Sequence, residues 1–116
     1  MTRDRIVELL ISAGANKSEA KVLIFLYENA EATQRQIEVN MNMRQPEVSR
    51  ALSSLVEKGI VKFRQVKKVG RGRPVKVYSL NRDFKEIVKS YIDAKRKELE
   101  QIKRDLDELM SHVVCM

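Results

Sequence analysis

Apolar residues recur at helical spacing through the first part of the chain, separated by residues that favour helix ends. Thr2 can cap a first helix, which we expect to stop at Gly14. Asn16 and Glu19 form a capping-box pattern, which predicts the start of a second helix. The face of this second helix that we expect to lie in the core carries Ala20, Leu23, Ile24 and Tyr27.

A short third helix is predicted next. Thr33 and Gln36 repeat the capping-box pattern, so this helix should run from about residue 34 to residue 39 and carry Ile37 inward. It is followed by residues 40–43, where two asparagines suit a tight turn.

The fourth predicted helix, over about residues 45–58, is strongly amphipathic. Pro46 is tolerated in its first turn, and Gly59 is a suitable stop. Its two faces differ in chemistry, because one is aliphatic and the other consists of small or polar side chains. The aliphatic face carries Val48, Ala51, Leu52, Leu55 and Val56, and the polar face carries Ser49, Arg50 and Ser53.

Residues rich in β-branched and aromatic side chains flank the sequence GRGRP and predict a β-hairpin. Its strands would span Val61 to Val69 and Val75 to Leu80. The predicted fold class is therefore mainly α with a small antiparallel β-hairpin. The order of the elements is that of a winged helix-turn-helix.

From Phe84 onward the chain has no proline or glycine, and apolar residues recur with a seven-residue period that only Lys85 and Lys95 interrupt. Charged residues of both signs flank this seam, which favours a coiled coil with an identical chain. The alternative, a helix folded back on its own domain, is expected in part for residues 84–92. The direction of pairing stays open. The predicted dimerisation positions are Val88, Ile92, Leu99, Ile102, Leu106, Leu109 and Val113.

The chain of 116 residues is therefore expected to hold one small domain and an appendage. Residues 1–82 would form the winged helix-turn-helix with its N-terminal helix. Residues 83–116 would form the C-terminal dimerisation helix.

Positive charge is concentrated in the middle of the sequence. The formal net charge is +7, and residues 44–76 contain ten Lys and Arg against two acidic residues, so the rest of the chain is nearly balanced. A charge excess that served solubility alone would be scattered. This cluster therefore favours a polyanion, such as a nucleic acid, as a partner.

Groups that support catalysis or cofactor binding are scarce. The chain has one histidine, His112, and one cysteine, Cys115, and it has no P-loop or dinucleotide-binding glycine pattern. We therefore expect no enzyme activity, no cofactor and no metal. The longest apolar run, Val22 to Tyr27, is too short to span a membrane, and no signal peptide is recognisable. We therefore expect a cytoplasmic protein with no membrane partner.

Three segments carry a resemblance to a known family: SEAKVLIFLYENAEATQRQIE, RQPEVSRALSSLVEKGIV and GRGRPVKVYSL. Over about residues 16–80 the chain resembles the DNA-binding domain of archaeal TrmB-like regulators, which are related to the MarR superfamily. The resemblance implies a reader of double-stranded DNA. Two features depart from the family pattern. Many such regulators carry a large effector-binding domain for which this chain has no room, and Glu47 places an acid near the groove.

The resemblance implies that the helix at about residues 45–58 enters the major groove, and its slim polar face independently suits that groove. Arg50 is the first candidate for a base or phosphate contact. The alternative is a surface ion pair with Glu47 or Glu57. The predicted DNA-binding residues of this unit are Gln34, Gln36, Arg44, Gln45, Pro46, Glu47, Ser49, Arg50 and Ser53.

The hairpin tip, residues 67–74, is predicted to insert into the minor groove, because a thin loop with arginines suits its negative potential. The alternative is a loop that serves solubility. If the tip inserts into the minor groove, Lys62 and Arg64 would face phosphates. The predicted DNA-binding residues of the tip are Lys67, Lys68, Arg71 and Arg73.

The predicted function is a sequence-specific, homodimeric regulator of transcription that binds double-stranded DNA and, by analogy with the family, represses. The alternative is a winged-helix module that contacts protein or RNA in a larger assembly and has only non-specific affinity for nucleic acid. The sequence identifies neither the operator and target genes nor a small-molecule effector.

Overall fold

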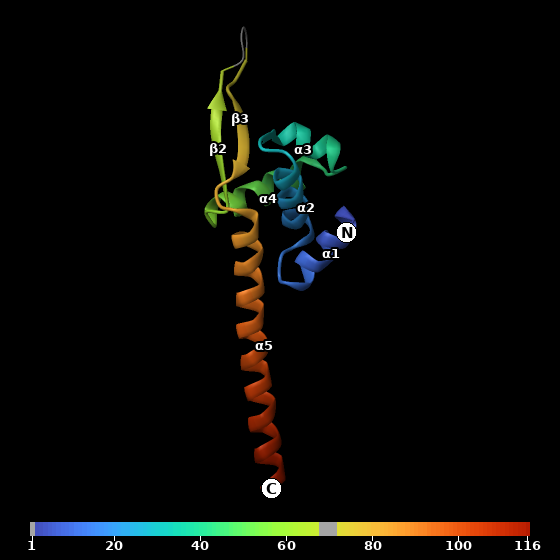
Figure 1. Cartoon of the computed structure of the whole chain (residues 1–116), viewed down its shortest axis with the longest axis vertical. Coiled ribbons are helices and arrows are strands. Elements are labelled where there is room, and N and C mark those ends of the chain that lie inside the picture. Colours follow the sequence, from blue (N-terminus) through green and yellow to red (C-terminus); the bar gives the residue numbers. More distant parts are fainter. Residues whose placement is uncertain (1, 68–71) are drawn as a thin grey trace.

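Four helices and the base of a small sheet form a domain. The two-stranded hairpin of this sheet and a long helix project from the domain in opposite directions (Figure 1). The computed structural model describes residues 2–67 and 72–116. The predicted fold class, mainly α with a small antiparallel sheet in the winged-helix arrangement, is confirmed. The elements are α1 (Arg3–Ser12), α2 (Lys17–Glu28), β1 (Ala32–Thr33), α3 (Gln34–Asn40), α4 (Gln45–Glu57), β2 (Val61–Val66), β3 (Val75–Leu80) and α5 (Phe84–Val114).

The predicted helix caps form, with one difference. The Thr2 hydroxyl accepts a hydrogen bond from the backbone N–H three residues later at 3.2 Å. Asn16 Oδ1 accepts the backbone N–H of Glu19 at 2.8 Å, but the Glu19 carboxylate does not complete a capping box. It is buried and pairs with Lys58 Nζ of the α4 C-terminus at 3.1 Å. This pair ties the first turn of α2 to the end of α4.

The sheet has one strand more than predicted. Its order is β1-β3-β2, and both pairings are antiparallel. β2 ends at Val66, and the predicted strand end at Val69 lies outside the described residues. The additional strand β1 has two residues, and Ala32 pairs with Tyr78 of β3. Because α3 starts directly after β1, this pairing fixes the start of α3 against the hairpin.

The main core lies where α2, α3, α4, the base of the sheet and the start of α5 meet. Tyr27, predicted to lie in this core, is instead 61% exposed. Its ring stacks on that of Phe84, with 4.3 Å between the ring centroids, and this residue from the first turn of α5 covers it only in part. The fully buried large side chains of the core are Leu23, Ile37, Leu52, Leu55, Ile87, Val22, Val48 and Val61.

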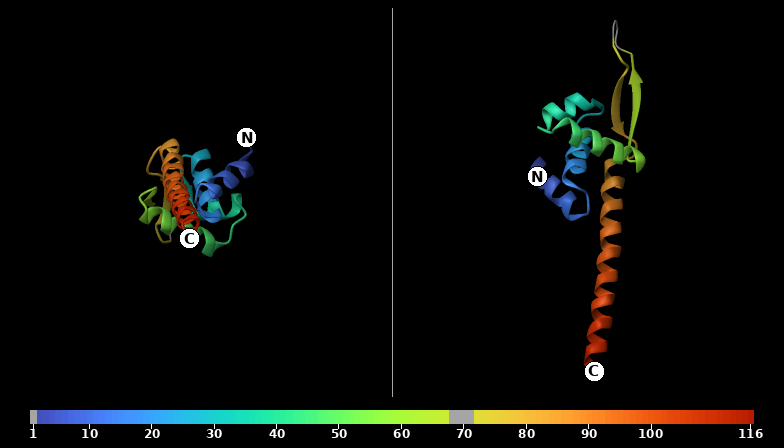
Figure 2. Two further views of the ribbon diagram at one scale, coloured as in Figure 1. Left: turned by 90° about the horizontal axis from the view of Figure 1, so that it is seen from below. Right: turned by 180° about the vertical axis from the view of Figure 1, so that it is seen from behind.

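α5 packs on the domain only through its first turns. Val88 and Tyr91 pack against a second apolar cluster, which α1 and α2 form, in agreement with the expectation for residues 84–92. Beyond Lys95 every residue is exposed, and the molecule extends over 76 × 28 × 25 Å (Figure 2). No helix among the described residues combines the length and the apolarity that a membrane crossing requires.

Candidate nucleic-acid interface

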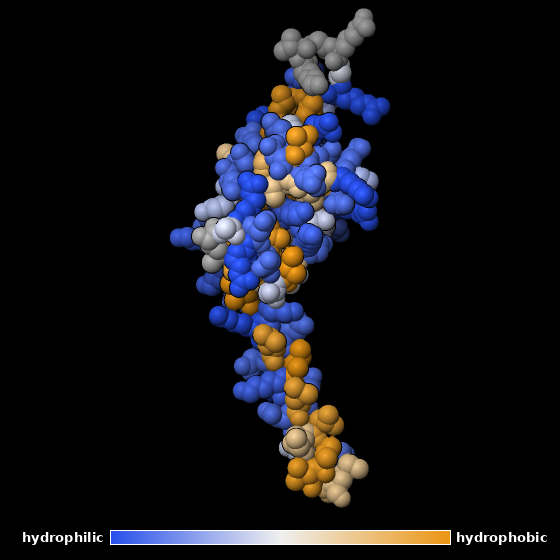
Figure 3. Space-filling model, turned by 90° about the vertical axis from the view of Figure 1, so that its right-hand side faces the viewer, coloured by the Kyte–Doolittle hydropathy of each residue, from blue (hydrophilic) through white to orange (hydrophobic). Residues whose placement is uncertain are grey.

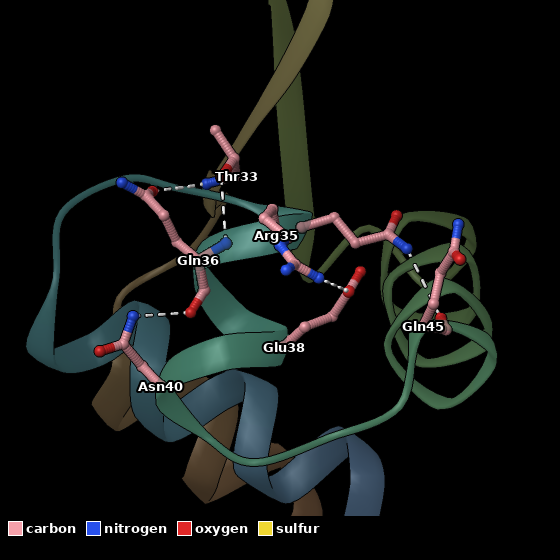
Figure 4. Close-up of polar contacts among 7 residues, drawn as sticks. Thr33, Arg35, Gln36, Glu38, Asn40 and Gln45 are labelled. Carbon is pink, nitrogen blue, oxygen red and sulfur yellow. Dashed lines mark hydrogen bonds and ion pairs between the residues drawn. The ribbon is translucent and has the colours of Figure 1, made fainter.

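The helix-turn-helix unit consists of α3, the turn at residues 41–44 and α4, and a capping box fixes its start (Figure 4). The backbone N–H of Gln36 donates to Thr33 Oγ1 at 3.2 Å, and the backbone N–H of Thr33 donates to Gln36 Oε1 at 2.9 Å. Asn40 Nδ2 donates to the carbonyl oxygen of Gln36 at 2.7 Å. α3 therefore has defined ends although it is only seven residues long. The oxygen of the Gln36 side chain is engaged in this cap.

The turn holds α3 and α4 in a fixed relation. Asn42 adopts a φ of 51°, a left-handed conformation that asparagine tolerates better than most residues. Met41 and Met43 on either side of it are buried in the core. Gln34 Nε2 of the first turn of α3 lies 3.5 Å from the carbonyl oxygen of Gln45 at the start of α4.

α4 presents the two faces that the sequence predicted. Val48, Ala51, Leu52 and Leu55 are buried, whereas Ser49, Arg50 and Ser53 are exposed. At its N-terminal end Arg44, Gln45 and Pro46 are exposed, and Glu47 is half-buried. Arg44 occupies the cap position without a side-chain cap bond. The backbone N–H groups of this first turn therefore have no capping side chain, and such groups can bind an anion.

Arg50 lies on the exposed face of α4. Its Nε donates to the carbonyl oxygen of Pro46 at 3.4 Å. Within the described residues it forms no ion pair, so the alternative pairing with Glu47 or Glu57 does not occur in this structure. Arg50 lines a hollow of about 440 Å³ between α4 and the start of α2, together with Glu47 and Ser18.

The hairpin of β2 and β3 extends the basic surface away from the domain. Lys67 and Arg73 at its described end are exposed, and the other two predicted tip residues, Lys68 and Arg71, lie outside the described residues. Arg64 was expected to face a phosphate, but it pairs with Glu31 just before β1, at 2.6 Å.

A second hollow, of about 460 Å³, lies between the start of α3 and the exit of the hairpin. It brings the predicted Gln34 together with two basic residues that the sequence reasoning missed as site residues, Arg35 and Lys76. Lys76 Nζ lies 4.7 Å from the centroid of the Phe63 ring. Burial raises the pKa of the Tyr78 phenol in its wall above its ordinary value. In the sequence, Arg35 could have been recognised as a site residue only from its position between the two predicted glutamines, Gln34 and Gln36.

The predicted dimerisation positions divide into two groups. Val88 packs against the α1 and α2 cluster of its own chain, and Ile92 is half-buried. The other positions form an uncovered apolar stripe: Leu99, Ile102, Leu106, Leu109 and Val113.

Comparison with known proteins identifies the family. The MarR family pattern matches residues 13–72, a segment that begins just before α2, contains the helix-turn-helix unit and reaches the hairpin tip. The chain belongs to the MarR family. Its match to transcription factor E of Methanopyrus kandleri is 31% identical over 111 residues, which is 95% of this chain and 58% of that protein. The chain thus spans little more than half the length of that curated relative.

Two solved structures support this MarR-family fold. A possible transcriptional regulator from Methanosarcina mazei superposes with a TM-score of 0.62 at 17% identity, covering 85% of this chain and 87% of that one. A MarR family regulator from Neisseria meningitidis superposes with a TM-score of 0.53 at 16% identity, covering 89% of this chain and 68% of that one.

The family match supports the predicted function class, a DNA-binding regulator of transcription, and does not favour the alternative of a protein- or RNA-contact module. The family and its solved neighbours are transcription regulators rather than enzymes. In residues 2–67 and 72–116 no group of three or more His, Cys, Asp or Glu side chains could hold a metal ion.

Proposed function

We propose that this MarR-family chain reads a specific duplex site as a homodimer, with α4 in the major groove and residues 67–74 in the minor groove. One observation carries the proposal. α4 buries Val48, Ala51, Leu52 and Leu55 of its aliphatic face, and it exposes Ser49, Arg50 and Ser53 on its polar face. A helix with this slim outer face fits the major groove and can hydrogen-bond to base edges.

The basic side chains of the hairpin would supply much of the affinity for DNA. Lys67 and Arg73 are exposed at the end of the hairpin, and Lys68 and Arg71 belong to the same sequence. Cations on a thin hairpin are attracted to the focused negative potential of a narrow minor groove. Arg44 and the uncapped first turn of α4 would hold a phosphate beside the recognition helix.

Homodimerisation is the second part of the proposal. MarR family regulators bind DNA and typically act as dimers. Residues 83–116 would join two readers, each formed by residues 1–82, so that the second DNA contact becomes intramolecular. By analogy with the family the regulator represses in the cytoplasm. The resemblance of residues 16–80 to archaeal TrmB-like readers is a finer, proposed assignment.

Selection of bound duplexes from a random pool tests the proposal. We expect one enriched, palindromic site, bound roughly a thousandfold more tightly than random DNA at physiological salt. Enrichment without symmetry would contradict the dimeric reading. Binding of all duplexes with equal affinity would contradict sequence-specific regulation.

The variant Arg50→Ala tests whether α4 contacts the bases of the selected site. The variant should bind about 10- to 100-fold more weakly and lose discrimination at one base position in each half-site. Arg104→Ala is the matched control, because it removes the same charge from exposed α5. Equal losses for the two variants would mean that Arg50 contributes only net charge.

A further inference from the structure

The distal half of α5 carries an apolar stripe that none of the described residues of its own chain covers. Figure 3 shows it as an orange band along the helix, and Leu106 and Leu109 are each 60% exposed. In the proposed homodimer, on which this inference rests, a second copy of α5 covers the stripe. The stripe runs along the helix through Leu99, Ile102, Leu106, Leu109 and Val113.

The two edges of this stripe differ in charge. The acidic edge holds the residues that precede Leu99 and Leu106, which are Glu98 and Asp105. The basic edge includes Lys103, which follows Ile102. In a coiled coil these edge positions decide the direction of pairing, because they meet across the interface.

We infer that two copies of α5 pair in parallel from Leu99 to Met116. In a parallel pair each residue of the acidic edge faces the position five residues further along on the other helix, which is uncharged Met110 for Asp105. Glu98 then faces Lys103 of the second copy, and the two-fold symmetry repeats this pair. Identical apolar residues meet in each layer.

Antiparallel pairing brings like edges together. The antiparallel register that covers the whole stripe sets Leu106 against Leu109 of the second copy. This register also sets the two Asp105 carboxylates against each other across the symmetry axis. It leaves Glu98 facing only His112. The edge charges therefore favour the parallel pair.

The shape of the molecule agrees with parallel pairing. The hairpin projects from the domain opposite to the C-terminus of α5 (Figure 1), so a parallel pair places both readers at one end, side by side. In the antiparallel register the first residues of the two α5 helices would lie about 70 Å apart, twice the ~34 Å of one DNA turn.

Lys95 marks where the paired segment begins. Its side chain is 37% exposed, and Nζ lies 3.5 Å from the Glu98 carboxylate of its own chain. In a parallel pair Lys95 would meet Lys95, and two like charges disfavour close contact. The helices therefore diverge on the N-terminal side of this residue, where each is already packed on its own domain through Val88 and Tyr91.

Disulfide trapping tests the direction of pairing. Leu99→Cys and Val113→Cys are each made in the full chain with Cys115→Ser, then oxidised mildly and separated without reductant. Both variants should form covalent dimers, because each residue meets its own counterpart only in a parallel pair. Ser111→Cys, on the outer face, is the control and should remain uncrosslinked.

Sedimentation of the same proteins separates the possible failures. Dimers that crosslink at neither position would overturn parallel pairing and leave the homodimer intact. Monomers at tens of micromolar for the parent protein would overturn the homodimer itself, and parallel pairing with it.

Charge reversal gives a second measurement that requires no cysteine. Lys103→Glu should raise the dimer dissociation constant about tenfold, and adding Glu98→Lys in the same chain should restore it. Arg104→Glu is the control, because it makes the same charge change on the outer face. An unchanged dissociation constant for Lys103→Glu would contradict the parallel register, since Lys103 faces uncharged Met110 in the antiparallel one.

Discussion

α4 and the distal half of α5 are both amphipathic helices, yet the chain treats them in opposite ways. α4 buries its aliphatic face against α2, α3 and the sheet, and it exposes serine and arginine. Distal α5 exposes its aliphatic face along with its charges. The comparison separates two kinds of surface. A helix whose apolar side is satisfied can offer a polar face to DNA, whereas a helix whose apolar side is uncovered requires a protein partner.

The largest expected effect comes from comparing one leucine of α4 with one leucine of distal α5. Leu55→Ala in α4 should lower the free energy of unfolding by about 2–5 kcal/mol, because the side chain is fully buried and its removal leaves a cavity. Leu106→Ala should change the unfolding of the dilute, monomeric protein by less than about 0.5 kcal/mol. Urea denaturation followed by circular dichroism measures both. Equal losses would mean that distal α5 packs within its own chain.

The next effect concerns association rather than folding. Ile102→Asp places a carboxylate in the middle of the stripe, where pairing would have to remove it from water. We expect the dimer dissociation constant to rise at least about a hundredfold, with the melting of the dilute protein unchanged. Sedimentation velocity over a range of concentrations measures this. A variant that sediments like the parent would place the dimer contact elsewhere.

The same comparison explains which features were predictable from sequence. The start and end of α4 depend on local signals, namely Pro46, the spacing of its leucines and Gly59, whose φ is 76°. The exposed face followed directly from that spacing. The long helix was predictable for the same reason, because its period needs no knowledge of distant residues.

Contacts between distant segments were not predictable. β1 exists because Ala32 pairs with Tyr78, and two residues carry no period of their own. Arg64 was expected to face a phosphate, and its ion pair with Glu31 could not be foreseen because the two residues lie 33 positions apart in the sequence. In the structure their side chains are 2.6 Å apart. Tyr27 fits the helical pattern of a core residue, but its exposure depends on where α5 begins. In each case the tertiary arrangement decides.

A third prediction compares two lysines that pair with glutamates. Lys58 of the α4 C-terminus pairs with Glu19, which is only 3% exposed, so Lys58→Met would leave a carboxylate buried without its partner. We expect a loss of about 1–3 kcal/mol, since half of the Lys58 side chain is exposed. Lys95→Met, which removes an exposed pair in α5, should change the unfolding of the dilute, monomeric protein by less than about 0.5 kcal/mol. Denaturation of both variants at pH 7 measures the difference, and equal values would mean that burial of Glu19 does not matter.

The smallest expected effect lies at Tyr91, where α5 leaves the domain. Its hydroxyl is buried, and within the described residues it has no hydrogen-bond partner. Because an unsatisfied buried hydroxyl destabilises the folded state, Tyr91→Phe should leave stability unchanged or raise it by up to about 1 kcal/mol. A loss of more than about 1 kcal/mol would mean that the hydroxyl has a partner.

A dependence on pH sharpens this last prediction. Burial, and to a smaller extent the Glu19 carboxylate, raise the pKa of Tyr91 above its ordinary value, while Lys58 opposes them. The unfolded chain therefore releases the phenolic proton first, so the parent protein is not affected by this ionisation below pH ~10 and loses stability as the pH rises further. Phenylalanine has no such proton. The stability advantage of Tyr91→Phe over the parent should therefore grow between pH 9 and pH 11, and denaturation of both proteins across this range measures it. A constant difference would mean that the phenol ionises equally in the folded and unfolded states, and that the junction between the domain and α5 is open to water.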